Sequence, residues 1–438
     1  MSSRPNIIYM HSHDTGRYIQ PYGYAVDTPH MQRLAEQGVL FRHAFCAAPT
    51  CSPSRAALTT GQWAHCTGMT GLAHRGWSLT DPKRHLTFTL REAGYHCVLS
   101  GVQHVTSHDP TQTLGYHEAR RGDPAADACA FLDDAPRQPF FLAVGFGMTH
   151  RNGKRGGAYN DPPWQGDARY VRPPEPMPDT PETRRDHADF CVAAHRLDAA
   201  YGRILDALDR SGLAGNTLVI CTTDHGPPSP LMKCNVFDAG IGVYLIMRGP
   251  GGFEGGRVID PIVSHVDLFP TICDVAGIDA PSWLQGSSIT PLVRGETERI
   301  RDELFAEVTY HAAYDPQRAV RTERYKYIRR YGDRSTPVLS NIDDSPSKSV
   351  MLDAGFADYH LPREALYDLA LDPNERDNLV DAAPHAAIAT DMRARLDRWM
   401  RDTNDPLLQG PVPPPRGAKV NRTDDASPQK PPVTVGRG

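Results

Sequence analysis

Residues 5–14 have the sequence PNIIYMHSHD, a short apolar run that ends in histidines and an aspartate. Runs of this length, rich in β-branched and aromatic residues, are typical of strands buried in a sheet. We predict strands at Pro5–Met10, Cys97–Leu99, Pro139–Phe146, Thr217–Thr222 and Val243–Met247. Helical patterns lie between them, at Pro29–Gln37, Ser54–Thr59, Asp186–Leu208 and Asp267–Ala276. The alternation predicts an α/β fold with a mostly parallel central sheet flanked by helices, in which ligands bind at the carboxyl ends of the strands.

The character of the sequence changes near Arg299. Short β-rich runs then follow, with one helical pattern after them: Leu304–Thr309, Ala319–Arg321, Tyr325–Ile328 and the helical Pro384–Arg401. We predict an α/β domain over residues 1–298, a smaller C-terminal α+β domain over 299–405, and a Pro- and Gly-rich tail over 406–438. The tail is expected to be disordered or to lie across a neighbouring subunit of a homo-oligomer. Residues 151–184, rich in Pro, Gly and Asp, are expected to form a working loop over the site.

Composition excludes several classes of function. The 438 residues carry a formal net charge of -5, with 47 basic and 52 acidic residues scattered among each other, so no nucleic-acid partner is expected. No stretch approaches the roughly 20 apolar residues of a membrane helix, and no membrane partner is expected. The first residues lack the pattern of an export signal, and the nine cysteines show no CxxC spacing, so we expect a cytoplasmic protein with reduced thiols.

The most informative motif is CSPSRAALTTG, residues 51–61. It places a cysteine at a predicted helix N-terminus, and helix spacing brings Arg55 back toward Cys51. Free N–H groups, the helix dipole and a guanidinium all favour an anion at such a point. The residues therefore indicate an oxyanion site around Cys51, although a buried cysteine before a helix is an equal alternative on the motif alone.

The same motif resembles the signature of the type I sulfatases of the alkaline phosphatase superfamily, in which a maturase oxidises the cysteine of CxPxR to formylglycine. The resemblance extends over about residues 5 to 400, through PNIIYMHSHD, TPHMQRLAEQGVLFRHAF, HCTGMTGL, PFFLAVGFGMTH, TTDHG and LYDLALDPNERDNL. Three stretches are most similar to the N-sulfoglucosamine sulfohydrolase group of that family: GQWAHCTGMTGLAH, DHGPPSPLMKCN and EVTYHAAYDPQRAV. The resemblance implies that residues 1–298 are catalytic and that the substrate is a small sulfate ester or sulfamate, such as a sulfated sugar.

The resemblance also implies a divalent metal. The family places acids after its first strand and an Asp-Asn or Asp-His pair after a later one, positions held here by His13-Asp14 and Asp224-His225. With Cys51 they form the implied ligand set, although an aspartate such as Asp14 or Asp224 alone could simply cap a turn. The family metal is calcium, but the imidazoles of His13 and His225 make manganese or zinc plausible here.

Three further residues match family positions. His104 corresponds to the histidine that takes the proton when sulfate is expelled, His150 to a histidine beside the leaving group, and Lys233 to a cation on the substrate oxyanion. Together with Cys51 and Arg55 they form the implied catalytic set. His65 and His74 are candidates to line the pocket, and His311 is a candidate to reach the substrate.

Val102 stands where the family commonly has a lysine in GKxH. Relatives that hydrolyse phosphonate monoesters and phosphodiesters also lack this lysine and also carry Asp-His at the second metal pair. Such a hydrolase is therefore an alternative within the superfamily. A non-catalytic relative that binds anions or glycans is a third reading, because a fold does not by itself carry an activity.

Overall fold

The centre of the molecule is an eight-stranded sheet. The computed structural model describes residues 4–153, 156–160 and 163–436. In spatial order the strands are β10 (Arg257–Ile259), β2 (Val39–Phe41), β9 (Leu245–Arg248), β7 (Thr217–Thr223), β1 (Asn6–Ser12), β6 (Phe140–Gly145), β4 (His96–Gly101) and β5 (Glu118–Arg120). β1 lies at the middle and pairs in parallel with both β6 and β7. Only β9 runs antiparallel to its neighbours, β2 and β7, so the sheet is mostly parallel as predicted.

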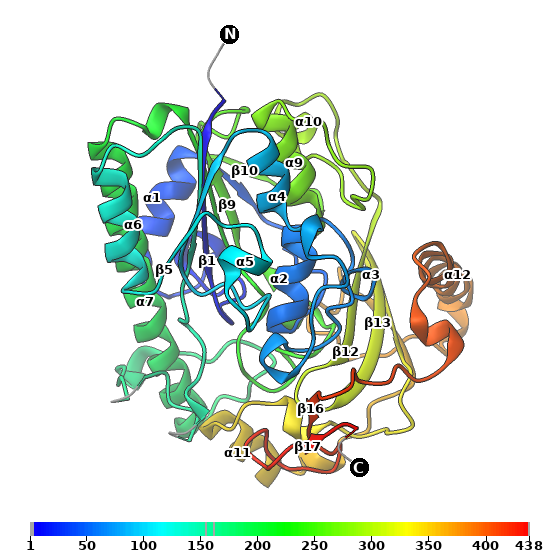
Figure 1. The fold of residues 1–438 in the computed structure, drawn as a ribbon. Coiled ribbons are helices and arrows are strands. Elements are labelled where there is room, and N and C mark those ends of the chain that lie inside the picture. Colours follow the sequence, from blue (N-terminus) through cyan, green and yellow to red (C-terminus); the bar gives the residue numbers. More distant parts are fainter. Residues whose placement is uncertain (1–3, 154–155, 161–162, 437–438) are drawn as a thin grey trace.

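Helices cover both faces of this sheet (Figure 1). One layer contains α1 (Pro29–Gln37), α6 (Pro124–Asp133) and α7 (Pro181–Arg210). The other layer contains α2 (Cys51–Thr60), α4 (Leu86–Glu92), α9 (Leu268–Ala276) and α10 (Thr290–Val293). Every residue of β1 is buried, because a parallel strand covered on both faces has no side open to water. The predicted α/β class is thus confirmed, and no described helix combines the length and apolarity needed to cross a membrane.

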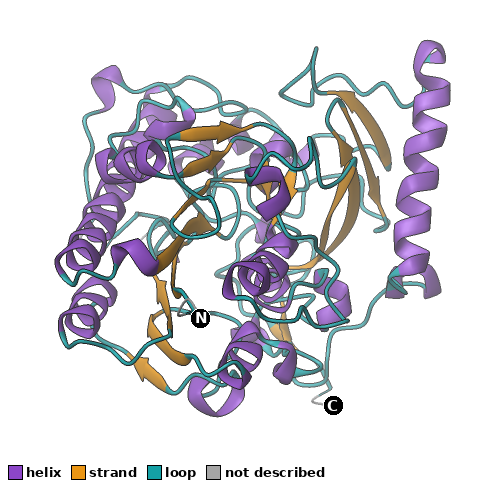
Figure 2. Ribbon diagram, turned by 90° about the horizontal axis from the view of Figure 1, so that it is seen from above, coloured by secondary structure: helices purple, strands orange, loops and turns teal. Residues whose placement is uncertain are grey.

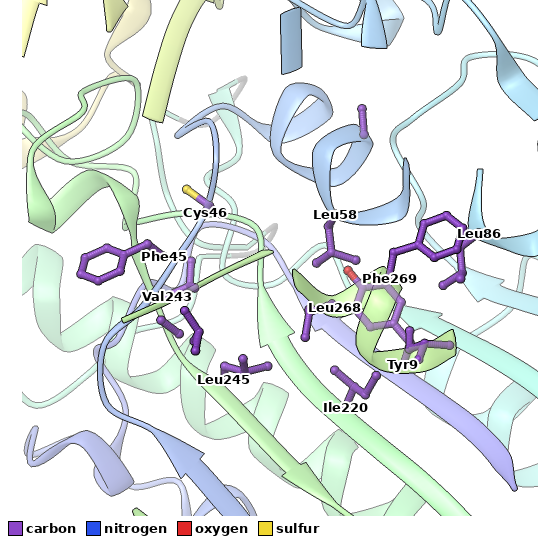
Figure 3. Close-up of a cluster of buried hydrophobic side chains, with 14 of the residues drawn as sticks. Tyr9, Phe45, Cys46, Leu58, Leu86, Ile220, Val243, Leu245, Leu268 and Phe269 are labelled. Atoms are coloured by element: carbon purple, nitrogen blue, oxygen red, sulfur yellow. The ribbon is translucent and has the colours of Figure 1, made fainter. Parts of the chain in front are cut away.

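The core between the sheet and the second helix layer is built from side chains of alternating strand positions. Figure 3 shows Tyr9 and Ile220 of two neighbouring strands facing Leu58 of α2 and Phe269 of α9. The opposite strand positions, such as Ile8, point into the other core against α1, α6 and α7. This period-two division fixes the register of β1, since a one-residue slip would exchange its two faces.

Two predicted elements differ from the structure. The segment Val243–Met247 is not one strand but two, because β8 (Gly242–Val243) pairs with β3 (Ala44–Phe45) in a separate small sheet that also holds β11 (Val263–Ser264). The predicted helix Ser54–Thr59 begins three residues earlier, at Cys51. Pro53 is compatible with this start because the first turn of a helix does not need its N–H group.

A second, antiparallel sheet follows in the chain, as the sequence predicted for the C-terminal region. It contains β12 (Glu303–Tyr310), β13 (Tyr314–Thr322), β14 (Tyr325–Arg330) and β15 (Glu364–Asp368). Its outer face packs on α12 (Ala386–Asp402), which Figures 1 and 2 show at the edge of the molecule. Its inner face joins the main core through Leu304, Ala306 and Val308. A short helix, α11 (Pro346–Asp353), lies between β14 and β15 in the chain.

The tail does not behave as the sequence suggested. Its described part, residues 406–436, packs on its own chain and forms a small hairpin of β16 (Lys419–Val420) and β17 (Val433–Thr434). Asn421 accepts a hydrogen bond from Arg75 at 2.8 Å, and Lys348 donates to the carbonyl of Ala426 at 2.8 Å. The expectation of a disordered tail is therefore wrong for these residues, whose polar groups find partners within the chain, and the alternative of an arm on another subunit stays a prediction.

The expected working loop, residues 151–184, is only partly described, because 154–155 and 161–162 lie outside the described residues. Its first residue, Arg151, is buried and pairs with Asp186 of α7 at 2.6 Å. Arg151 also donates to the carbonyl of Pro228 at 2.9 Å. The start of the loop is thus anchored beside the segment that follows β7.

None of the nine cysteines, all of which lie among the described residues, forms a disulfide. Cys97, Cys221 and Cys273 are buried in β4, β7 and α9. Burial raises the pKa of each of these three thiols, which keeps them protonated and unreactive.

Candidate functional site

Four neighbouring parallel strands end at the same edge of the large sheet, and each is followed by a predicted site residue. His13 and Asp14 follow β1, and Asp224 and His225 follow β7. His150 follows β6, and His104 follows β4. Because parallel strands deliver the residues after them to one edge, the order of the sheet brings these side chains together.

The N-terminus of α2 faces this edge. Thr50, the residue before the helix, is extended, and the backbone N–H of Ser54 closes the first turn on its carbonyl at 2.9 Å. The Ser54 hydroxyl donates to the carbonyl of Asp224 at 2.5 Å, which ties the helix start to the end of β7. Cys51, the first residue of the helix, is 1% exposed. The sequence thus holds Cys51 at a fixed point above the strand ends.

Two carboxylates and two imidazoles form the centre of the site. His13 Nδ1 lies 3.0 Å from Asp224 Oδ2 and 3.7 Å from Asp14 Oδ1. His225 Nε2 lies 3.3 Å from Asp14 Oδ1 and 3.7 Å from Asp224 Oδ1. All four side chains are buried. Each imidazole therefore faces both carboxylates at once.

This centre attracts positive charge. Burial alone would lower the pKa of both histidines, but the carboxylates raise the pKa of His13 to about 10 and that of His225 to about 9. The ligand atoms of His13, Asp14, Cys51 and Asp224 all lie within 4.8 Å of one another. His13 Nδ1 is buried without a hydrogen-bond partner of good geometry, as a metal-ligating nitrogen would be. The donor set suits a divalent cation.

Arg55 acts on this centre in a different way from the one expected. It was predicted to reach back to Cys51, but its Nε and Nη2 donate to Asp224 Oδ2 at 3.2 and 3.0 Å. It also donates to the carbonyl of Ser12 at 2.8 Å and contacts His11 Nδ1. Burial would raise the pKa of Asp224, but His225 and Arg55 hold it well below its usual value. Arg55 therefore orients Asp224 and keeps its carboxylate ionised.

Cys51 lies against the same centre. Its Sγ is 3.4 Å from His225 Nε2 and 4.0 Å from Asp14 Oδ1. Burial would raise the pKa of the thiol, but the charges of Lys233 and His225 hold it well below its usual value. A group at position 51 is thus held as an anion by its neighbours, which is the environment of a nucleophile.

Lys233 joins the site from the segment after β7. Its Nζ lies 2.9 Å from Asp14 Oδ2 and 2.9 Å from Asp343 Oδ2, and 3.5 Å from His150 Nε2. The sequence prediction missed Asp343, which is 110 residues away in the chain and carries no local motif. The two acids raise the pKa of Lys233 well above its usual value despite burial, so it stays a cation.

Histidines form the wall on the other side of Cys51. His74 Nδ1 lies 3.0 Å from His104 Nε2, with the two rings stacked. His104 also groups with His13 and Cys51. His311, from the turn after β12, is buried beside Cys51, whose charge acts on it together with that of Lys233. The structure thus brings His74 and His311 to the site, as the sequence suggested.

His65 is not at this site. Its Nδ1 lies 2.9 Å from Glu307 Oε1, in a buried cluster between α3 (Ala64–Thr67) and the second sheet. The prediction that it lines the pocket is wrong, because the helical turn directs its ring toward β12. Val102 supplies no charge where the family lysine stands, and its backbone N–H donates to the carbonyl of Gly145 at 3.0 Å.

Comparison with known proteins agrees with this geometry. A model described as Sulfatase matches residues 5–278, well over half of the chain, and the protein belongs to the sulfatase family of sulfuric ester hydrolases. A second model, described as N-sulphoglucosamine sulphohydrolase, C-terminal, matches residues 231–354. The resemblance seen in the sequence is confirmed.

Proteins named as sulfatases match this chain over most of its length. N-sulphoglucosamine sulphohydrolase of Homo sapiens is 28% identical over 446 residues, 88% of this chain and 88% of the relative. An ulvan-active sulfatase of Formosa agariphila is 26% identical over 457 residues, 92% of this chain and 76% of the relative. The solved structure of a 2-O GAG sulfatase has a TM-score of 0.74 at 23% identity, with 93% and 94% of the two chains covered.

Proposed function

We propose that the protein hydrolyses the sulfate ester or sulfamate of a small sulfated sugar, with formylglycine made from Cys51 as nucleophile and one divalent metal as cofactor. The observation that carries this proposal is the convergence of Cys51 with His13, Asp14 and Asp224 within 4.8 Å at the strand ends. Their order in the chain and in the sheet is that implied by family membership.

The metal would be held by His13, Asp14, Asp224 and His225, beside residue 51. A divalent ion in such a site polarises substrate oxygens and lowers the pKa of a bound hydroxyl. Calcium prefers six to eight oxygen ligands, whereas two of the four protein donors here are nitrogens. The donor set therefore favours manganese or zinc over the calcium expected from family resemblance.

Formylglycine supplies a hydrated aldehyde, whose hydroxyl attacks the sulfur and whose second hydroxyl allows sulfate to leave when the aldehyde reforms. Conversion of Cys51 requires a maturase that reaches the motif CSPSR. Cys51 is 1% exposed in the folded chain, so we infer that the maturase acts before folding is complete.

The other side chains have separate tasks. His150 has a side chain 40% exposed and lies at the outer end of the site, where it can protonate the departing oxygen or nitrogen. His104 lies on the inner side, against residue 51, and burial lowers its pKa, which favours the neutral base needed to remove a proton. Lys233 stabilises charge that develops on the substrate oxygens, and Arg55 keeps Asp224 ionised.

A sugar substrate is supported by the kinds of relatives that match. One of them is named for N-sulphoglucosamine, and the chain also matches the C-terminal model of that group. We therefore propose a sulfated aminosugar as the first substrate to test. The protonating group His150 serves an N–S bond as well as an O–S bond, because each leaving atom needs a proton.

A phosphonate monoesterase or phosphodiesterase is the second candidate. It is favoured by Val102, which leaves one cation fewer around the transferred group, and by His225 in the second metal pair. The same nucleophile and metal would then act on phosphorus. In a non-catalytic anion-binding protein, the proposed nucleophile and metal ligands would have no chemical function.

Peptide mass spectrometry tests the nucleophile. Trypsin releases residues 43–55, HAFCAAPTCSPSR, which contain both Cys46 and Cys51. Alkylation of the denatured protein labels Cys46 in every molecule and Cys51 only where the thiol remains, so Cys46 is an internal control. Protein made with the maturase should give the singly labelled peptide with an aldehyde at position 51. A doubly labelled peptide in fully active protein would rule the formylglycine proposal out.

Paired assays test the reaction class. An aryl sulfate, N-sulfoglucosamine and a phenyl phosphonate ester are offered to the same metal-loaded preparation. We expect turnover of at least one sulfated compound with a kcat/KM above that of the phosphonate. Turnover of the phosphonate alone would overturn the sulfatase assignment, and sulfate binding without turnover of any compound would favour the non-catalytic role.

A further inference from the structure

A cavity of about 380 Å³ lies beside the second sheet (β12–β15), away from the residues around Cys51. Its walls include Phe237, Ile328, Arg330, Phe356, Tyr359 and Tyr367. None of the residues assigned above to metal binding or catalysis lines it. The volume is within the range of small-molecule sites, which are usually apolar with a few polar groups that orient the ligand.

The floor of the cavity is one face of β14. Side chains alternate across a strand, so Lys326, Ile328 and Arg330 share a face, while Tyr327 points to α12. Ile328 lies directly opposite Ala365 of β15, which lines the cavity too. The same face therefore carries two buried cations, four residues apart, with an apolar residue between them.

The two cations differ in their carboxylate partners. Lys326 Nζ has two carboxylates at hydrogen-bond distance, Asp238 at 2.8 Å and Glu375 at 2.9 Å. Arg330 is 6% exposed, and no described carboxylate lies within 4.0 Å of its guanidinium nitrogens. Its buried Nη1 has no hydrogen-bond partner among the described residues. A buried guanidinium stays charged, and leaving it unpaired is unfavourable unless a ligand satisfies it.

The surroundings of Arg330 define what such a ligand would look like. Its guanidinium carbon lies 6.0 Å from the centre of the Phe237 ring, which in turn packs on Tyr367 with ring centres 6.1 Å apart. Phe356 and Tyr359 form a stacked pair, with centres 6.0 Å apart, on another wall. Flat apolar walls beside a single cation suit a flat apolar body with one anionic group.

The acids of the lining do not compete for Arg330. Glu175 at the rim pairs with Arg172 at 2.9 Å, and Glu375 pairs with Lys326. Arg376, also at the rim, is exposed and adds a second positive charge near the entrance. The charge of Asp315 acts on Arg330 from outside the lining, and Arg330 is a buried cation with which no described carboxylate of the lining pairs.

We propose that this cavity is a second binding site, for a small organic anion whose aromatic or alicyclic body lies between the aromatic walls and whose sulfonate, sulfate or carboxylate group pairs with Arg330. The site is independent of the hydrolytic centre. Its occupant is recognised by one charge and an apolar surface.

A fluorescent pair of probes tests the site on the full-length protein. The anion 8-anilinonaphthalene-1-sulfonate and the neutral N-phenyl-1-naphthylamine have the same apolar body and differ in the sulfonate. We expect saturable binding of the anion, and at least a tenfold weaker affinity in Arg330→Met. The neutral probe should bind the two proteins alike. Equal affinities of the anion for the two proteins, or no saturable binding to the wild type, would overturn the proposal.

Two controls keep this test interpretable. Arg398→Met removes a charge from the exposed face of α12 and should leave both probes unaffected. Thermal unfolding and sulfatase activity show whether Arg330→Met is folded. If it is not, a crystal of the wild type soaked with the anion gives the answer, since the sulfonate must lie within hydrogen-bond distance of Arg330. A sulfonate bound elsewhere would contradict the proposal.

Discussion

The protein buries two clusters of charge that are built on opposite principles. Around Cys51, the carboxylates of Asp14 and Asp224 face one point together with two imidazoles, and the buried Nδ1 atoms of His13, His104 and His311 have no hydrogen-bond partner among the described residues. Between the second sheet and α3, in contrast, two acids and two cations pair with one another. Arg318 donates to Asp405 at 2.5 and 3.0 Å, and His65 pairs with Glu307 at 2.9 Å.

The difference distinguishes a binding centre from a structural joint. The cluster of His65, Glu307, Arg318 and Asp405 connects four segments, and Arg318 also donates to the carbonyl of Val308 at 2.8 Å. Its charges pair with one another and hold the second sheet to the main body, although His65 Nε2 and Glu307 Oε2 have no hydrogen-bond partner among the described residues. The charges around Cys51 are satisfied only partly, and they gain most from an ion or a substrate placed among them.

The largest expected effect is a loss of activity when the centre around Cys51 is changed. Cys51→Ala removes the nucleophile, and we expect kcat/KM for a sulfated substrate to fall by about 10⁴-fold or more, with little change in thermal stability. Cys273→Ala is the control, because Cys273 is fully buried in α9 and is assigned no role at the centre. It should keep its activity and lose stability. Substantial activity in Cys51→Ala would show that the reaction does not use residue 51.

The second effect is a loss of stability when the cluster of His65, Glu307, Arg318 and Asp405 is changed. Arg318→Met leaves Glu307 and Asp405 buried without their shared cation, and we expect a loss of about 3–5 kcal/mol in the free energy of unfolding. The folded fraction should retain its kcat, because the cluster does not touch the site. Denaturant titration with activity measured in the same samples checks both statements. Arg398→Met, on an exposed helix face, should change stability by no more than about 0.5 kcal/mol, and an equal effect of the two variants would contradict the assignment.

The centre around Cys51 could be predicted from sequence because its parts are local. Each of its main residues follows a strand or begins a helix, and apolar runs such as Pro5–Met10 reveal the strands. A mostly parallel sheet then brings the residues after the strands to one edge. The motif at residues 51–61 adds the helix start, and the resemblance to the sulfatase family supplied the roles of the separate residues, so local patterns and that resemblance together grouped them.

The structural joint could not be predicted in this way. Asp405 and Arg318 meet across 87 residues, and neither has a local pattern that indicates a partner. The same reason hid Asp343 from the site, and it led to the wrong role for His65. The tail was misjudged because composition reports how little apolar surface it has, not that polar groups such as Asn421 find partners on the rest of the chain.

The third prediction concerns the identity of the metal at the centre. His13→Asp replaces one nitrogen ligand by an oxygen ligand. We expect the apparent affinity for calcium to rise about tenfold while that for zinc falls. Metal content after chelation, reloading and gel filtration gives a readout that does not depend on activity. His13→Ala is the control, since it should weaken binding of both ions. An unchanged preference in His13→Asp would mean that His13 is not a ligand.

The smallest expected effect is a dependence of the free energy of unfolding on pH, caused by His65 in the structural joint. Burial opposes the charge on His65, but Glu307 raises its pKa from 6.5 to about 10, so the pair stabilises the fold fully below about pH 6.5 and loses this contribution as the pH rises toward 10. His65→Gln keeps a hydrogen-bond donor for Glu307 but cannot titrate. The difference in free energy of unfolding between wild type and His65→Gln should therefore shrink as the pH rises from 6.5 to 10.

Glu307 keeps a cation when His65 is neutral, because Arg318 remains 3.4 Å from it. Urea titrations of both proteins across this range measure the difference, and titrations at the metal centre cancel because both proteins share them. A difference that stays constant from pH 6.5 to 10 would mean that the His65–Glu307 contact is a neutral hydrogen bond. The structural joint would then rest on Arg318 alone, and the effect of Arg318→Met should exceed the upper end of its expected range.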